Sequence, residues 1–140
     1  MERCASGATA AILVIIAGAA CGGGESRFVG SWVGIRKLAN EANMPTHIQN
    51  TLKPVNLEIK SDGTFKLEEY GIPSTGDVAY QANKALLTVK TQMNRALPPE
   101  SEPKPLELEI GTDGTAKFRD PAGFDTSWVI MKRKEKQPGP

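Results

Sequence analysis

Two segments of the chain carry the same acidic phrase, which could in principle bind a cation. Leu57 to Glu69 reads LEIKSDGTFKLEE, and Leu108 to Asp120 reads LEIGTDGTAKFRD. Asp62 and Asp113 would be the calcium ligands, but an EF-hand loop needs oxygen ligands at several regular positions and a terminal Glu, which neither copy supplies. Asp also stabilises turns through hydrogen bonds to the backbone, and Gly accepts positive φ. We therefore predict two tight hairpins without metal, each built on a type I turn with a G1 bulge or on a type I′ turn.

Other residues with catalytic potential are sparse. His47 is the only histidine, so a His-based metal cluster is excluded and any Ser/His/Asp arrangement would have to include it. Glu68 and Glu69 are neighbours on a predicted strand, so they point to opposite faces and cannot form a close carboxylate pair. The glycines at 22–24 precede no strand-to-helix unit and do not predict a phosphate site. The sequence therefore predicts a protein that is not an enzyme and that needs no cofactor.

The first residues have the pattern of an export signal. The apolar run from Ala8 to Ala20 is shorter than the about 20 residues that span a bilayer, and it fits the apolar region of a signal peptide. AGAAC, ending at Cys21, resembles the lipobox of bacterial lipoproteins, although Gly18 stands where that family usually has a large aliphatic residue. The resemblance implies a signal peptide at 1–20 and a lipid on Cys21, which becomes the first mature residue. Cleavage after Ala19, giving a soluble secreted protein, and an uncleaved anchor are the alternatives.

Cysteine content and net charge limit the cellular compartment and the classes of binding partner that fit this chain. Cys4 would leave with the signal, so the mature domain has no disulfide pair and its fold must rest on burial. A lipid on Cys21 would supply the attachment to a membrane, because no later segment is apolar for long enough. The net charge of +1 argues against a nucleic-acid partner. We expect an exported, membrane-anchored lipoprotein of a bacterial cell envelope, either periplasmic or on the outer surface.

Strand patterns dominate the rest of the chain. VNLEIK alternates Val55, Leu57 and Ile59 with polar residues, which is the period of a half-buried strand. Further runs of this kind are TFKLEEY, DVAYQA, KALLTVKT, PLELEI, TAKF and SWVIMKRK. Their hairpin spacing predicts an all-β fold, a small antiparallel up-and-down barrel or bent meander of about seven or eight strands.

Composition divides the chain into a flexible tether at 21–27, a barrel domain at 28–134 and a charged, Pro-rich, disordered tail at 135–140. Met44, Ile48 and Leu52 recur at helical spacing after the first strand and predict one short amphipathic helix, which would lie across one barrel end as a lid. QMNRALPPESEPKP, at 92–105, predicts an exposed irregular loop.

The stretch FVGSWVGIRKL resembles the opening strand of lipocalins. Its Gly30-Ser31-Trp32 is similar to the G-x-W motif of that family and of the lipocalin-like (calycin-type) domains of small bacterial lipoproteins. The later order is also similar, with a long crossover, two DGT hairpins and a basic residue in the closing strand. The resemblance implies that Trp32 closes one barrel end and that a basic side chain packs over its face. Alternation in WVIMKR makes Arg133, rather than Lys132, the match, and the contact would contribute about 0.5–2 kcal/mol.

Two functions fit such a barrel, because an interior of eight short strands is either filled by side chains or holds one small ligand. The first is a non-catalytic interaction or structural module whose surface contacts another envelope protein. The alternative is a carrier that holds a small hydrophobic ligand inside the barrel. The large side chains expected to line the interior are Phe65, Leu67, Tyr80, Leu87, Leu108, Phe118 and Trp128.

Overall fold

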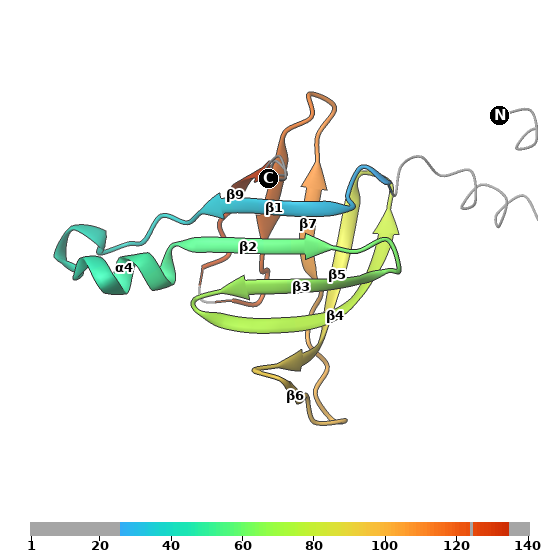
Figure 1. Cartoon of the computed structure of the whole chain (residues 1–140), viewed down its shortest axis with the longest axis horizontal. Helices are drawn as coiled ribbons and strands as arrows, with labels where there is room; N and C mark the ends of the chain where they lie inside the picture. Colours follow the sequence, from blue (N-terminus) through green and yellow to red (C-terminus); the bar gives the residue numbers. More distant parts are fainter. Residues whose placement is uncertain (1–25, 124, 135–140) are drawn as a thin grey trace, which may run out of the picture.

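The computed structural model describes residues 26–123 and 125–134 (Figure 1). The predicted signal peptide, the lipid attachment at Cys21 and the predicted tail lie outside these residues. The elements follow in the order β1 (Gly30–Ile35), η2 (Glu41–Asn43), α4 (Thr46–Leu52), β2 (Pro54–Ile59), β3 (Thr64–Glu69), β4 (Ile72–Gln81), β5 (Lys84–Gln92), β6 (Arg95–Ala96), β7 (Leu106–Ile110), β8 (Ala116–Arg119) and β9 (Val129–Arg133).

The strands close into an eight-stranded antiparallel barrel. Strands β1 to β5 pair in chain order, β5 pairs next with β7, and β7, β8 and β9 continue the order until β9 returns to β1. The ring closes where Trp32 faces Arg133 and Gly34 faces Met131. Strand β6 pairs with the end of β5 outside this ring. The predicted all-β barrel is confirmed, and closure leaves the ring strands without exposed edges.

Two walls of the barrel cross each other, and β4 belongs to both. In Figure 1 strands β1, β2 and β3 run across the view in front of the upright β5 and β7. The first part of β4 pairs with β3, and Ser74 to Gln81 pairs with β5, with a register shift between Thr75 and Gly76. A Cβ at Gly76 would lie 1.9 Å from the carbonyl oxygen of Thr88. Glycine therefore permits the close backbone approach at this bend.

The core is built by alternation along each strand. In β2 the side chains of Val55, Leu57 and Ile59 are buried, whereas Asn56 and Glu58 between them are exposed. The same alternation in the other strands brings apolar side chains into one contiguous cluster. Apolar burial stabilises by about 25 cal/mol per Å², so this cluster is the main source of stability in a domain without disulfides.

Both DGT copies form the same type of hairpin. In the first, the backbone N–H of Gly63 donates to the carbonyl of Lys60, and the N–H of Lys60 donates to the carbonyl of Thr64. In the second, Gly114 donates in the same way to Gly111. Gly63 has φ 87° and Gly114 has φ 83°, while the two residues before each have negative φ. The turn is therefore type I with a G1 bulge, and the type I′ alternative is excluded.

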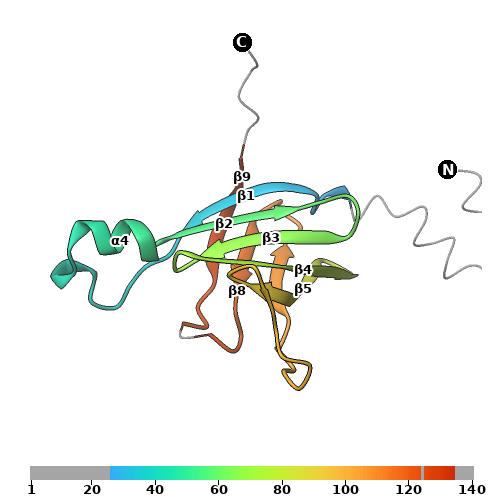
Figure 2. The same ribbon diagram turned by 60° about the horizontal axis from the view of Figure 1, so that its bottom comes forward.

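The segment between β1 and β2 contains the predicted helix, but the helix lies outside the barrel instead of across its end. Figures 1 and 2 both show α4 beyond the ends of β1 and β2, and none of its residues is buried. The side-chain amide of Gln49 donates to the carbonyls of Glu41 at 2.8 Å and Met44 at 2.9 Å. These hydrogen bonds hold the segment together. Ile48 and Leu52 form an apolar stripe that is too narrow to bury the helix against the barrel.

Candidate functional site

The barrel interior was the first candidate for a ligand site, and the protein's own side chains occupy it. Five of the residues expected to line it are at most 3 % exposed and belong to the contiguous apolar cluster: Phe65, Leu67, Leu87, Leu108 and Phe118. Tyr80 is half-buried and packs against this cluster. These side chains point into the barrel, where they belong to one contiguous apolar cluster.

Trp128 does not line the interior, so this part of the prediction is wrong. It precedes β9, in which Val129 and Met131 point inward, and alternation turns Trp128 to the outside. The guanidinium carbon of Arg119 lies 4.4 Å from the centroid of the Trp128 ring. Arg119 also pairs with Glu107 at 2.9 Å on this outer face.

Trp32 and Arg133 meet at the barrel end where the described chain begins. The guanidinium carbon of Arg133 lies 4.3 Å from the centroid of the Trp32 ring. Its two terminal nitrogens donate to the carbonyls of Val29 at 2.6 Å and Arg27 at 2.5 Å. The indole N–H of Trp32 donates to the carbonyl of Phe28 at 2.9 Å. Arg133 therefore ties the segment before β1 to the last strand.

Phe28 closes this end of the barrel. Its side chain is 1 % exposed, and its ring centroid lies 5.5 Å from that of Tyr80. Arg27 reaches across the same end and donates to the carbonyl of Ala82 at 3.1 Å. The residues just before β1, and not the helix with Met44, Ile48 and Leu52, thus cover the barrel interior. Sequence reasoning missed Phe28 because it assigned the residue only to the start of the first strand.

Asp62 and Asp113 stabilise the hairpin turns in which they lie. Asp62 Oδ1 accepts a hydrogen bond from the backbone N–H of Thr64 at 3.0 Å, and Asp113 Oδ1 accepts one from Thr115 at 3.0 Å. Hydrogen bonds from these threonines lower the pKa of both carboxyl groups. Over residues 26–123 and 125–134, no group of three or more His, Cys, Asp or Glu side chains is arranged to hold a metal ion.

The other residues considered for catalysis lie apart. His47 is exposed on α4, and its carbonyl accepts a hydrogen bond from the hydroxyl of Thr51 at 3.1 Å. Glu68 is exposed on the outer face of β3, while Glu69 is half-buried on the other face and binds Arg36.

No helix in the described part of the chain is both long enough and apolar enough to cross a membrane.

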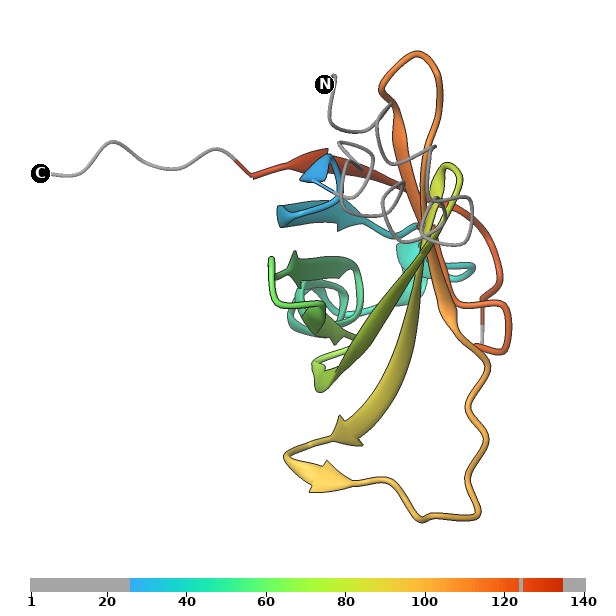
Figure 3. The ribbon, with the colours of Figure 1, turned by 90° about the vertical axis from the view of Figure 1, so that its right-hand side faces the viewer.

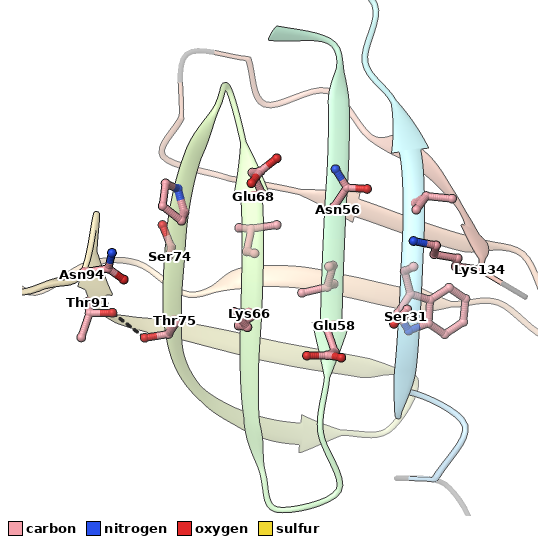
Figure 4. Close-up of a pocket in the computed structure, with 15 residues that line it drawn as sticks. Ser31, Asn56, Glu58, Lys66, Glu68, Ser74, Thr75, Thr91, Asn94 and Lys134 are labelled. Carbon is pink, nitrogen blue, oxygen red and sulfur yellow. Dashed lines mark hydrogen bonds between the residues drawn. The ribbon is translucent and has the colours of Figure 1, made fainter. Parts of the chain in front are cut away.

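The outer face of the barrel carries a trough of about 330 Å³ across β1 to β4. Figure 4 shows its floor, where the outward side chains of Asn56, Glu58, Lys66 and Glu68 lie side by side on β2 and β3. One wall is the end of β5 and the turn to β6, and Figure 3 shows this hairpin projecting from the barrel. A hydrogen bond between the hydroxyls of Thr75 and Thr91 attaches this wall to β4. Lys134, after β9, forms the opposite side. We refer to this surface as the outer trough.

Charge in the outer trough is mixed. Lys66 and Lys134 bring positive charge, and Glu58 and Glu68 bring negative charge onto the same face. Such a surface suits a polar partner with complementary charges better than an apolar molecule. Its residues were visible in the sequence as the polar positions of alternating strands, but only the topology places them on one face.

The structure also contains a buried arginine that sequence reasoning missed. Arg36 follows β1, is 2 % exposed, and donates from Nη2 to Glu69 Oε2 at 2.6 Å. Its guanidinium carbon lies 4.6 Å from the centroid of the Tyr70 ring. Burial raises the pKa of the Glu69 carboxyl, the charge of Arg36 opposes this rise, and the nearby Asp120 adds to it. An arginine within GIRKL carries no signal of burial, because such residues are usually exposed.

Comparison of the chain with protein families, with curated proteins and with solved structures found no match in any of the three.

Proposed function

We propose that this chain is an exported, lipid-anchored envelope protein whose lipocalin-like barrel is a solid scaffold that presents its outer trough to another envelope protein. The observation that carries the proposal is the occupied interior. Leu87, Leu108 and Phe118 are fully buried in the contiguous apolar cluster, and Phe28 covers one barrel end. A small barrel filled in this way leaves its outer surface for binding.

The place where the described chain begins supports the orientation of the proposed protein. Ser26 to Val29 lie at the barrel end that Arg133 and Trp32 close. A lipid on Cys21 would hold this end next to the membrane through a few residues. The outer trough runs along the side of the barrel, so a neighbouring envelope protein could reach it. Mixed charges such as Lys66 and Glu58 favour a specific polar contact over adhesion to lipid.

The anchor is tested by metabolic labelling with an alkyne fatty acid in a bacterium that processes lipoproteins. We expect the wild-type chain to carry the label and to sediment with membranes. Cys21→Ala should lose both properties, whereas Cys4→Ala should keep them, because Cys4 would leave with the signal. Labelling that survives Cys21→Ala would contradict the proposed anchor.

The partner contact is tested by photo-crosslinking in cells. A photoreactive amino acid at Asn56 lies in the outer trough, and one at Thr112 lies exposed in the β7–β8 hairpin as the matched control. We expect a discrete crosslinked species from position 56 alone, and its loss when Lys66→Glu reverses a charge beside it. Equal capture from both positions, or capture insensitive to Lys66→Glu, would contradict a specific contact at the trough.

The alternative of a carrier for a small hydrophobic ligand makes an opposite prediction. Extraction of the purified chain followed by mass spectrometry should then recover one apolar compound in stoichiometric amount, and fatty acids should raise the melting temperature of the empty chain. We expect neither result. Recovery of such a compound would replace the scaffold proposal with the carrier.

A further inference from the structure

Each DGT turn contains an Asp-Gly peptide, a sequence that can rearrange chemically without an enzyme. In such a peptide the glycine nitrogen attacks the side-chain carboxyl carbon of the preceding Asp and closes a cyclic imide. Glycine permits this attack because no Cβ shields its nitrogen. Asp62 and Asp113 are both exposed, so solvent reaches both carboxyl groups. The two turns are therefore the places where the described chain is open to this modification.

The rearrangement is a dehydration followed by a hydrolysis. The glycine nitrogen forms a bond to Cγ of the protonated carboxyl group, the bond from Cγ to the hydroxyl breaks, and the hydroxyl leaves with the amide proton as a water molecule. A solvent water then opens the ring. Opening at the backbone carbonyl gives isoaspartate, which has the mass of aspartate but an additional carbon in the main chain. A hairpin turn lengthened in this way no longer fits the register of its strands.

The reacting carboxyl groups are held by the threonine that follows each glycine. Asp62 Oδ1 accepts hydrogen bonds from the hydroxyl of Thr64 at 2.6 Å and from its backbone N–H at 3.0 Å. Asp113 Oδ1 accepts from the backbone N–H of Thr115 at 3.0 Å. These bonds lower the pKa of both carboxyl groups. Each group is therefore kept ionised, and the ionised form has no hydroxyl to lose as water.

The attacking nitrogens are also held. The N–H of Gly63 donates to the carbonyl of Lys60 at 3.2 Å, and the N–H of Gly114 donates to the carbonyl of Gly111 at 3.0 Å. Asp stands at the third position of each type I turn, where ψ is about 0°. Ring closure requires the following peptide to rotate towards the side chain, and this rotation breaks the turn hydrogen bond. The turn must therefore open before the imide forms.

We propose that Asp62 and Asp113 are the sites at which this protein undergoes isoaspartate formation, and that Thr64 and Thr115 limit its rate by holding the reacting carboxyl groups. The third residue of the DGT phrase thus has a purpose of its own: glycine allows the turn, and threonine protects it from the reaction that glycine permits. The proposal involves neither the lipid anchor nor the outer trough, so it stands or falls independently of the proposed function.

The two copies provide a control within one molecule, because the intrinsic rate of imide formation depends mainly on the residue after Asp, which is glycine in both. The purified full chain is incubated at physiological temperature and pH, either folded or in concentrated guanidinium chloride. Isoaspartate at each site is measured by peptide mapping with electron-transfer fragmentation, which distinguishes the isomers. We expect similar rates at both sites in denaturant, and rates at least about tenfold slower at both sites in the folded chain. A folded chain that isomerises as fast as the denatured chain would overturn the proposal.

Threonine-to-valine variants test the protecting contacts. Thr64→Val removes the hydroxyl and keeps both the backbone N–H and the shape of the side chain. We expect isomerisation at Asp62 to become about tenfold faster, because a charge-assisted hydrogen bond is lost, with no change at Asp113. Thr115→Val should accelerate Asp113 by a smaller factor, since the backbone N–H that valine keeps is the main donor there. No acceleration at Asp62 in Thr64→Val, or equal acceleration at both sites, would overturn the role of Thr64.

Discussion

Two arginines lie near opposite ends of β1 and make different contacts. Arg133 reaches the start of β1 from β9, and Arg36 follows the last residue of β1. Arg133 lies over the Trp32 ring and donates to two backbone carbonyls, so its charge is used where the chain enters the barrel. Arg36 is buried beside Glu69 and Tyr70 with two donors unpaired. Both terminal nitrogens of Arg133 have acceptors, whereas Nε and Nη1 of Arg36 have none in the described part of the chain. The contacts of Arg133 join the segment before β1 to the last strand, whereas the contact of Arg36 joins the end of β1 to the end of β3.

Arg133→Gln should destabilise the domain by about 1–2 kcal/mol, because the cation–π contact and two charge-assisted hydrogen bonds are lost. The free energy of unfolding is measured by urea denaturation, with the fluorescence of Trp32 as one of the signals. Lys132→Gln is the control, since Lys132 is exposed and its side chain points to the other face of β9. A similar loss in both variants would show that the contact contributes nothing specific.

Glu69 makes the stability of the protein depend on pH in an unusual direction. Burial raises the pKa of its carboxyl despite the ion pair with Arg36 at 2.6 Å. The folded chain therefore holds this proton more tightly than the unfolded chain, in which the pKa is about 4.3. The stabilising contribution is complete below that unfolded value and is lost as pH rises through the raised folded value.

Glu69→Gln cannot ionise, so the variant should gain stability relative to the wild type as pH rises from about 4 to about 7. Urea denaturation of both chains across this range measures the difference. Glu68→Gln, on the exposed face of β3, should show no such trend. If the free energy of unfolding of the wild type instead rose relative to that of Glu69→Gln with increasing pH, the ion pair would outweigh the cost of burying the carboxylate.

At the scale of elements, glycines and turns shape the sheet. Gly76 sits at the register shift of β4, where the strand passes from one wall to the other. Gly63 and Gly114 end the two type I turns with positive φ. The turn before β6 is of another kind, with Met93 at φ 53° and Asn94 at φ 64°. Each turn sets the direction of the strand that follows it. Together the turns determine which strands become neighbours in the ring.

Gly76→Ala should destabilise the domain by about 2 kcal/mol or more, because the new Cβ would collide with the Thr88 carbonyl and the Phe65 ring. Gly114→Ala is the informative comparison, since a Cβ there meets no atom within 4 Å and the cost comes from positive φ alone. We expect about 1 kcal/mol for that variant. Thermal denaturation of both chains measures the order, and a larger loss at Gly114 would contradict this explanation.

For the whole molecule, the filled interior predicts how the barrel responds to an artificial cavity. Phe118 is fully buried in the apolar cluster. Phe118→Ala should cost about 3–5 kcal/mol and leave a dry apolar void. Benzene should then raise the melting temperature of the variant and leave that of the wild type unchanged. A wild type stabilised by benzene would show that the native interior already has room for an apolar ligand.

Much of this architecture could be predicted from the sequence, because the physical causes are local. Alternation such as that of Val55, Leu57 and Ile59 requires only that one face of a strand be buried. The DGT turns follow from the preference of glycine for positive φ. The match of Arg133 to Trp32 came from the lipocalin resemblance together with the alternation of the last strand. The turn at Met93 and Asn94 could not be predicted, because Met93 rarely adopts positive φ even though Asn94 does so readily.

Side-chain periodicity along the chain was enough to predict the class of fold and the candidates for the barrel core. The register between strands, the cover over the barrel, the direction in which Trp128 faces and the burial of Arg36 with unpaired donors came from the folded structure alone. These features arise where segments distant in sequence meet, as β1 meets residues 125–130 and Phe28 meets Tyr80. Burial of a polar group depends on all the neighbours that surround it in space, and local pattern along one strand does not contain that information.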